Sequence, residues 1–253
     1  MDRILATLIF FTRLPFWRIK QVDAEHYKHV VPYWPLAGWL TGGIMAGVLW
    51  LAGQVMPLSI AWIVAIVARL LVTGCLHEDG LADFCDGMGG GVTRERVLTI
   101  MKDSHIGTYG VIGLILYFLF LIQMSALPLD LICPIVFVGD VWSKFVSSHI
   151  INILPYARKE DEAKNKTIYQ RMSAFEAFIG ALLGTIPAAV LLPKTYWPAL
   201  LAPVAVFILL VGLMKRRIQG YTGDCCGALF LISELAYLLM CLIIFNCQFS
   251  IFN

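Results

Sequence analysis

Three aspartates, Asp79, Asp83 and Asp86, stand at positions i, i+4 and i+7 in a polar stretch between two apolar runs. On an α-helix, at about 100° per residue, this spacing brings the three side chains within an arc of roughly 60°. Carboxylates so close together repel one another, and a divalent cation relieves that repulsion. Hard oxygen ligands suit Mg²⁺, with Mn²⁺ as the alternative. The spacing therefore predicts a metal-binding face, and the competing interpretation is an acidic helix end in solvent. Glu78 lies about 100° off this face, so we expect it only to cap or flank the site.

A run of glycines follows the aspartates directly and comprises Gly87, Gly89, Gly90 and Gly91. Because glycine has no side chain, backbone N–H groups can approach a phosphate closely at such a run. The run is equally typical of a flexible loop, and both interpretations stay open.

A second polar cluster begins with Arg94 and Arg96 and continues through Lys102, Asp103 and Ser104. Basic side chains beside a metal site supply the charge that a diphosphate substrate needs. We therefore expect Arg94, Arg96 and Ser104 to bind substrate.

A third cluster, residues 220–228, contains Thr222 and Asp224 and precedes an apolar run that carries Glu234. We expect these three residues to bind substrate as well. The charged residues within apolar runs are Arg69, Asp140, Lys144 and Glu234. Charges are expensive in lipid, so these side chains should face the interior and pair. Asp140 and Lys144, at i and i+4, fit a structural pair as well as a catalytic one.

The composition shows what surrounds these clusters. The 253 residues are 59% hydrophobic and only 14% charged, with a mean hydropathy of +0.79. A soluble domain carries about 25% charged residues, so soluble, disordered and fibrous classes are excluded. The net charge of +2 is too small to indicate a nucleic-acid partner. The seven cysteines form no C-x-x-C pair and predict neither a disulfide framework nor a zinc site.

The apolar runs predict an all-α, polytopic membrane bundle of about seven transmembrane helices, each needing about 20 apolar residues. The predicted spans are 31–52, 58–76, 109–126, 131–153, 177–192, 197–214 and 229–245. Pro57, Pro128 and Pro193 fall in short joints between them and predict tight turns. Residues 4–11 are too short to cross and predict an interfacial amphipathic segment. Glycines at 38, 42, 43 and 47 favour close packing inside the bundle over a dimer face.

Lysine and arginine concentrate on alternate connections, at the N-terminus and at residues 77–108, 154–172 and 215–228. By the positive-inside rule, these segments and the N-terminus lie in the cytoplasm and the C-terminus lies outside. The sequence therefore predicts one integral membrane domain, residues 1–253, in a bacterial inner membrane. Its active-site loops would be the three basic connections.

Taken in order, three motifs resemble one family. They are HEDGLADFCDG at 77–87, IMKDSHIGTYG at 100–110 and YTGDCCGA at 221–228, with TRLP at 12–15 and YWPLAG at 33–38 as weaker matches. Together they resemble the cobalamin synthase family, the adenosylcobinamide-GDP ribazoletransferases. Two positions depart from the family pattern: His105 stands where arginine is usual, and Glu78 where a hydrophobic residue is common.

The resemblance implies a metal-dependent phosphotransferase that acts late in the assembly of the coenzyme B12 nucleotide loop. Such an enzyme transfers the cobinamide phosphate of adenosylcobinamide-GDP to α-ribazole or its 5′-phosphate and releases GMP. The substrates and the lipid bilayer are then its partners, and the chain could form a homo-oligomer or a complex with other corrinoid enzymes. In this setting we expect Lys102 to orient the diphosphate and Asp103 to accept the hydroxyl proton. Asp224 would complete a second metal position or bind the ribazole hydroxyls. The alternative for both aspartates is helix capping.

Two other classes compete with this interpretation. A small-molecule transporter would explain the charges within spans, but the densest ionisable cluster lies at a membrane surface rather than at the midplane. A membrane CDP-alcohol phosphotransferase would also use clustered aspartates. Its signature, D-x-x-D-G-x-x-A-R followed by G-x-x-x-D-x-x-x-D, is not met after Asp79 and Gly80.

Overall fold

The computed structural model describes residues 1–158 and 168–252. Within these residues all regular secondary structure is helical apart from one isolated β-bridge, so the predicted all-α class is confirmed. The middle of the expected connection 154–172, residues 159–167, lies outside the described part. The α-helices are α1 (Asp2–Phe11), α2 (Ala24–Tyr27), α3 (Trp34–Gly53), α4 (Leu58–Thr73), α5 (Leu76–Gly90), α6 (Arg94–Ile100), α7 (Thr108–Ile122), α8 (Leu129–Ser148), α9 (Ile150–Ile153), α10 (Ala174–Leu191), α11 (Leu201–Ile218) and α12 (Gly223–Phe252).

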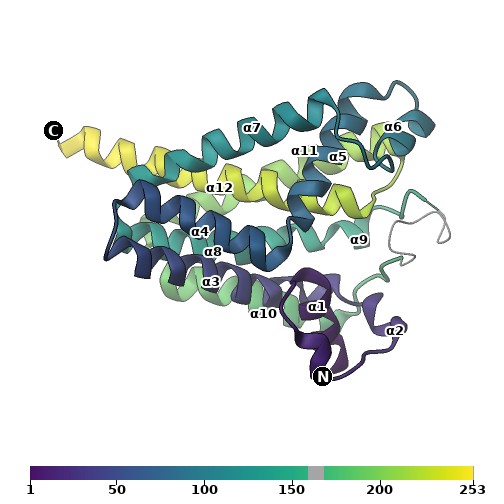
Figure 1. Ribbon diagram of the computed structural model, residues 1–253, viewed down its shortest axis with the longest axis horizontal. Helices are drawn as coiled ribbons and strands as arrows, with labels where there is room; N and C mark the ends of the chain where they lie inside the picture. Colours follow the sequence, from purple (N-terminus) through teal and green to yellow (C-terminus); the bar gives the residue numbers. More distant parts are fainter. Residues whose placement is uncertain (159–167, 253) are drawn as a thin grey trace.

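The long helices run side by side along the longest axis of the molecule (Figure 1). By length and apolar composition, five helical segments of the described chain could cross a membrane, or six if α4 and α5 form one bent span. A membrane bundle is therefore supported, and the expected count of seven is not confirmed.

The predicted span 58–76 is wrong at its end, because α4 stops at Thr73 and α5 leaves at an angle of 89°. Two consecutive residues at the break have left-handed backbone, Gly74 at φ +64° and Cys75 at φ +57°. Glycine adopts this conformation without steric cost. A Cβ on Gly74 would also lie 2.3 Å from the Arg13 side chain, so the bend leaves no room for a larger residue.

Much of the expected connections 77–108 and 215–228 is helix rather than loop. Residues 77–90 belong to α5 and residues 223–228 to α12. Gly87 and Gly89 lie within α5, where a Cβ would come 2.3 Å from Met101 Cγ and 2.6 Å from the Tyr109 ring. These glycines therefore let other elements pack against α5, and neither a phosphate-binding turn nor a flexible loop describes them.

The structure also bears on the predicted turns and on the glycines of the first span. Pro57, Pro128 and Pro193 each immediately precede a helical segment, namely α4, α8 and the 3₁₀ segment Lys194–Leu200. On α3, a Cβ on Gly38 would lie 3.0 Å from Val141 Cα, and one on Gly42 would lie 2.9 Å from Asp140 Cβ. Gly38 and Gly42 are thus packed against α8 inside the chain, whereas Gly47 is exposed and a Cβ there would meet no atom within 4 Å, so close packing is confirmed for only part of the glycine run.

Candidate active site

The first and third polar motifs meet where α5 packs on the first turns of α12. A Cβ on Gly80 would lie 3.0 Å from the Asp224 carbonyl oxygen, and a Cβ on Gly227 would lie 3.0 Å from the His77 carbonyl oxygen. Two glycines in facing positions allow the helix backbones to approach closely. This contact brings Asp79 of α5 to the same pocket as Asp224 of α12.

Polar and aromatic residues together line the pocket. The polar residues include Asp79, Asp224, Arg158 and Tyr156. Burial raises the pKa of Tyr156 to about 12, so its hydroxyl stays protonated and can donate a hydrogen bond at neutral pH. The aromatic residues include Phe10, Phe11, Trp34, His77 and Tyr169.

Asp224 is 7% exposed and lies among polar neighbours. Thr222 Oγ1 donates to Asp224 Oδ2 at 3.3 Å and accepts from the backbone N–H of Cys225 at 3.3 Å. Thr222 therefore caps the start of α12. This is the role that the alternative interpretation gave to Asp224. Arg158 Nη1 lies 4.0 Å from Asp224 Oδ2, which places a positive charge beside the carboxylate.

Arg158 is the main residue that the sequence interpretation missed, since it entered only as one of the basic residues that set the topology. The backbone places it: Ala157 N donates to Tyr221 O at 2.8 Å, and Tyr221 N donates to Pro155 O at 3.0 Å. Its guanidinium donates to Leu98 O at 2.9 Å. No sequence signal links residue 158 to residue 224, because their contact is purely tertiary.

A basic hollow adjoins the pocket and shares Arg158 with it. Arg94 and Lys102 also line this hollow. Arg94 donates to Ile218 O at 3.0 Å and to Ala157 O at 2.7 Å, so much of its hydrogen-bonding capacity holds α6 in place. The side chain of Arg96 is exposed, and its backbone N–H donates to the Thr93 hydroxyl at 3.3 Å. Substrate binding by Arg94 and Arg96 remains a prediction.

The three predicted metal ligands lie in different surroundings. Asp79 is exposed at the pocket, and Asp83 is buried. Asp86 accepts the backbone N–H groups of Gly107 at 2.7 Å and Gly110 at 2.8 Å, so its carboxylate caps α7. Within the described residues, no group of three or more His, Cys, Asp or Glu side chains is arranged to hold a metal ion. The metal-binding face therefore remains a prediction, with Asp86 already engaged in a structural contact.

Lys102, Asp103 and Ser104 are exposed on the connection from α6 to α7. The Asp103 side chain is 57% exposed, and its Oδ1 lies 2.7 Å from His105 Nδ1 and 3.0 Å from the His105 backbone nitrogen. These hydrogen bonds hold the pKa of Asp103 below its ordinary value. A lowered pKa makes a carboxylate a weaker base. Asp103 borders a shallow hollow with Asp86 rather than the pocket of Asp79 and Asp224, so its catalytic role remains a prediction.

Glu234 does not fit the expectation that it binds substrate. It is 1% exposed, and Arg69 Nη1 donates to its two carboxylate oxygens at 2.6 and 2.7 Å. Arg69 also donates to the Tyr117 hydroxyl at 2.7 Å and lies 3.9 Å from Glu78 Oε1. Glu78 thus faces the bundle core, and it does not belong to the predicted metal face.

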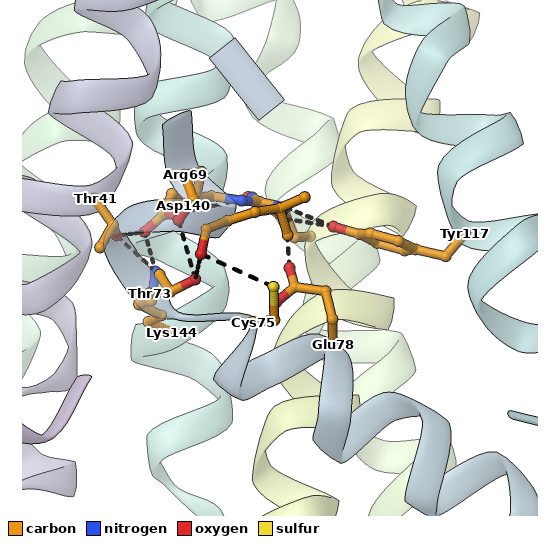
Figure 2. Close-up of polar contacts among 10 residues, drawn as sticks. Thr41, Arg69, Thr73, Cys75, Glu78, Tyr117, Asp140 and Lys144 are labelled. Atoms are coloured by element: carbon orange, nitrogen blue, oxygen red, sulfur yellow. Dashed lines mark hydrogen bonds and ion pairs between the residues drawn. The ribbon is translucent and has the colours of Figure 1, made fainter. Parts of the chain in front are cut away.

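Asp140 and Lys144 complete this buried charge network, which we define as Arg69, Glu78, Asp140, Lys144 and Glu234. Figure 2 labels the first four of these residues. Lys144 Nζ pairs with Asp140 Oδ1 and donates to Thr41 Oγ1 at 2.9 Å. Arg69 Nη1 lies 4.0 Å from Asp140 Oδ2. The expectation that charges within the apolar runs face inward and pair is confirmed.

Comparison with known proteins places the chain in a family. The model of the family described as cobalamin-5-phosphate synthase matches residues 3–242. A protein of Shewanella woodyi named adenosylcobinamide-GDP ribazoletransferase is 39% identical over 240 residues, which cover 92% of each chain. A protein of the same name from Leptospira interrogans is 32% identical over 250 residues, 94% of each chain. No solved structure matches this chain. On the family model and these near full-length relatives, the chain belongs to the cobalamin-5-phosphate synthase family.

Proposed function

We propose that this chain transfers the cobinamide phosphate of adenosylcobinamide-GDP to α-ribazole or its 5′-phosphate and releases GMP. The relatives that are named for this activity match this chain over nearly their whole length. The structural observation that supports it is one pocket that joins Asp79 and Asp224, from two separate motifs, to Arg158. Such a pocket offers acceptors for substrate hydroxyls and a cation for a phosphate.

The reaction needs little covalent chemistry from the protein, so positioning and charge dominate. A ribose hydroxyl oxygen forms a bond to the corrinoid-side phosphorus, and the bond from that phosphorus to the bridging oxygen breaks. GMP leaves with the bridging oxygen. The hydroxyl proton passes to a carboxylate, and Asp79 and Asp224 are the carboxylates that line the pocket. Arg158, which lines both the pocket and the basic hollow, is placed to hold the reacting phosphate at their boundary.

We also propose a divalent cation, Mg²⁺ or Mn²⁺, in this pocket. Two carboxylates in one pocket, together with substrate phosphates, form the kind of oxygen ligand set that Mg²⁺ uses in phosphoryl-transfer enzymes. Asp79 and Asp224 would hold the ion, with Asp83 one helical turn beyond Asp79. When bound, it would supply positive charge that neutralises the diphosphate.

Purified protein tests the activity directly. Incubation with adenosylcobinamide-GDP, α-ribazole 5′-phosphate and Mg²⁺ should release GMP, and a chelator should stop the release. CDP-diacylglycerol with a lipid alcohol is the matched control for the CDP-alcohol phosphotransferase alternative. Release of CMP in that control, with no GMP from the corrinoid substrate, would contradict the proposal.

We further propose that the pocket faces the cytoplasm of a bacterial inner membrane, with the C-terminus outside. The support is the basic charge at that end, on Arg94, Arg96, Lys102 and Arg158. Gly90 is exposed, and a Cβ there would meet no atom closer than 3.5 Å, so a cysteine fits. After the native exposed thiols Cys75 and Cys247 are replaced by serine, Gly90→Cys should react only when the reagent reaches the inner face of membrane vesicles. Reaction from the outer face alone would reverse the topology.

A further inference from the structure

A second hollow adjoins the pocket and shares Phe10 and Leu76 with it. A cation, Arg13, lines this hollow, and its side chain is exposed. Arg13 belongs to the TRLP motif at 12–15, and the proposed function gives no role to any residue of that motif. We call this the Arg13 hollow. None of its described lining residues also lines the basic hollow, so positive charge borders the pocket in two separate places.

The backbone fixes Arg13 at the junction of α1, α4 and α5. Arg13 N donates to Val72 O at 2.7 Å, close to the end of α4. The Arg13 side chain lies over Gly74, where the chain has left-handed backbone at φ +64°. A Cβ on Gly74 would lie 2.7 Å from Arg13 Cγ. The bend that directs α5 toward α12 therefore also leaves the space that the Arg13 side chain occupies beside the pocket.

The Arg13 guanidinium is available to an anion. It forms no hydrogen bond or ion pair with any residue that the structure describes, and no Asp or Glu is among the described residues that line the hollow. Tyr27 is half-buried in the same hollow, and its hydroxyl likewise has no partner among the described residues. Thr12 and Thr73 also line the hollow, but their hydroxyls donate to backbone carbonyls four residues earlier. Phosphate oxygens accept two parallel hydrogen bonds from a guanidinium and can accept another from a phenol hydroxyl.

The substrates of the proposed function carry phosphates in two places. The reacting diphosphate of the donor takes the proposed cation at Asp79 and Asp224, together with Arg158. α-Ribazole 5′-phosphate brings another phosphate, which takes no part in the reaction. Because like charges repel, this phosphate needs a positive charge of its own, away from the one that holds the diphosphate. Arg13 supplies such a charge at a different border of the same pocket.

Building on the proposed function, we propose that Arg13 and Tyr27 form the subsite for the 5′-phosphate of the acceptor. The guanidinium of Arg13 donates to two phosphate oxygens, and the Tyr27 hydroxyl donates to a phosphate oxygen as well. Unphosphorylated α-ribazole leaves these donors without an acceptor, so the chain prefers α-ribazole 5′-phosphate. The competing source of the same phosphate chemistry is the donor substrate.

Kinetics with the two acceptors test this subsite, because the unphosphorylated acceptor is an internal control for folding. In the original chain, KM for α-ribazole 5′-phosphate should lie about 10–100-fold below KM for α-ribazole, the size expected for hydrogen bonds to a charged group. Arg13→Gln should remove most of this difference by raising only the KM for the phosphorylated acceptor. The KM values for α-ribazole and for adenosylcobinamide-GDP should stay within about twofold.

Three further variants make the test specific. Arg13→Lys keeps the charge but loses the planar fork, so it should restore part of the preference. Tyr27→Phe keeps the ring and removes the hydroxyl, so the KM for α-ribazole 5′-phosphate should rise about threefold. Arg18→Gln is the matched control for the loss of charge, because Arg18 is exposed in the same N-terminal segment and lines neither the pocket nor the Arg13 hollow. Its kinetic constants should equal those of the original chain.

Binding provides a readout without turnover. In equilibrium dialysis, Arg13→Gln and Tyr27→Phe should each weaken binding of α-ribazole 5′-phosphate and leave binding of α-ribazole and of GMP unchanged. If Arg13→Gln does not fold, Arg13→Lys and Tyr27→Phe still decide the outcome, since both are predicted to reduce the preference between the two acceptors.

The outcomes separate the subsite from the activity. No preference between the acceptors in the original chain, or an unchanged preference in the folded Arg13 and Tyr27 variants, would overturn the subsite while the transferase activity stands. A rise in KM for adenosylcobinamide-GDP would overturn it and assign Arg13 to the donor. A lowered unfolding midpoint with both acceptors affected alike would assign Arg13 to the carbonyl end of α4. An original chain that releases no GMP under any condition would overturn the proposed function itself.

Discussion

The buried charge network and the pocket are built from the same residue types but differ in how their charges are satisfied. In the network, Glu234 is 1% exposed and both of its carboxylate oxygens accept from Arg69. At the pocket, Asp79 is exposed, and Arg158 Nη1 lies 4.0 Å from Asp224 Oδ2. A buried ion pair is costly to break by removing one partner, whereas a carboxylate that lines a pocket can bind a substrate. In this chain, the partners of a carboxylate therefore decide whether its role is structural or chemical.

The largest effect should follow from removing one partner of the network. Glu234→Ala removes the carboxylate whose two oxygens accept from Arg69 Nη1, and breaking a buried ion pair by removing one partner typically costs about 3–5 kcal/mol. We expect a strongly lowered thermal unfolding midpoint in detergent. Glu78→Gln is the matched control in the same network, since Glu78 lies 3.9 Å from Arg69 and Glu234 would still pair with the guanidinium. Replacing both Arg69 and Glu234 by apolar residues should recover part of the loss. Equal midpoints for Glu234→Ala and Glu78→Gln would contradict the comparison.

The next largest effect should appear at the pocket and in activity alone. Asp224→Asn and Asp79→Asn each remove a charge that lines the pocket, so turnover should fall by about 10²-fold or more. Half-maximal activity should also require more Mg²⁺, because fewer carboxylates remain to bind it. Unfolding midpoints should change little. Ordinary turnover at low Mg²⁺ in a folded Asp224→Asn or Asp79→Asn enzyme would exclude the substituted aspartate from the site.

Asp86 combines features of both regions, because it belongs to the predicted metal face but its carboxylate caps α7. Asp86→Ala should lower stability by about 1–2 kcal/mol, the typical cost of a lost cap. Turnover at saturating Mg²⁺ should stay within about tenfold, since the capping contact does not involve the pocket. Thermal unfolding and GMP release, measured on the same preparation, check both parts. If turnover fell by orders of magnitude in a stable protein, Asp86 would instead be a metal ligand.

The smallest effect is expected at Asp103, whose contacts are confined to its own turn. In Asp103→Asn the amide oxygen can still accept from the His105 backbone N–H, so turnover should fall less than about tenfold. Steady-state GMP release measures this. A fall of about 10²-fold in a folded protein would support the role in proton transfer that the sequence predicts.

The sequence by itself determined the class of the fold and much of its packing. Long apolar runs can bury their backbone polar groups in lipid only as helices, and prolines mark the turns. The cost of a charge in lipid already predicts that Arg69, Asp140, Lys144 and Glu234 face inward. The ordered motifs also pointed to the family. These features are readable because each depends on local composition or on spacing along one helix.

The tertiary structure decided which partner each charge takes and which residues make the pocket. Glu234 pairs with Arg69 of α4, Asp86 caps α7, and Arg158 reaches Asp224 through the pairing of residues 155–157 with Tyr221. The sharp bend at Gly74 and Cys75 turns α5 away from α4 and sets its acids against the start of α12. Electrostatic pairing depends on distances across the fold, and those distances are set by the packing of segments far apart in the chain. Spacing along one helix therefore predicts that acidic residues share a face of that helix. It does not predict which residues of other segments that face contacts.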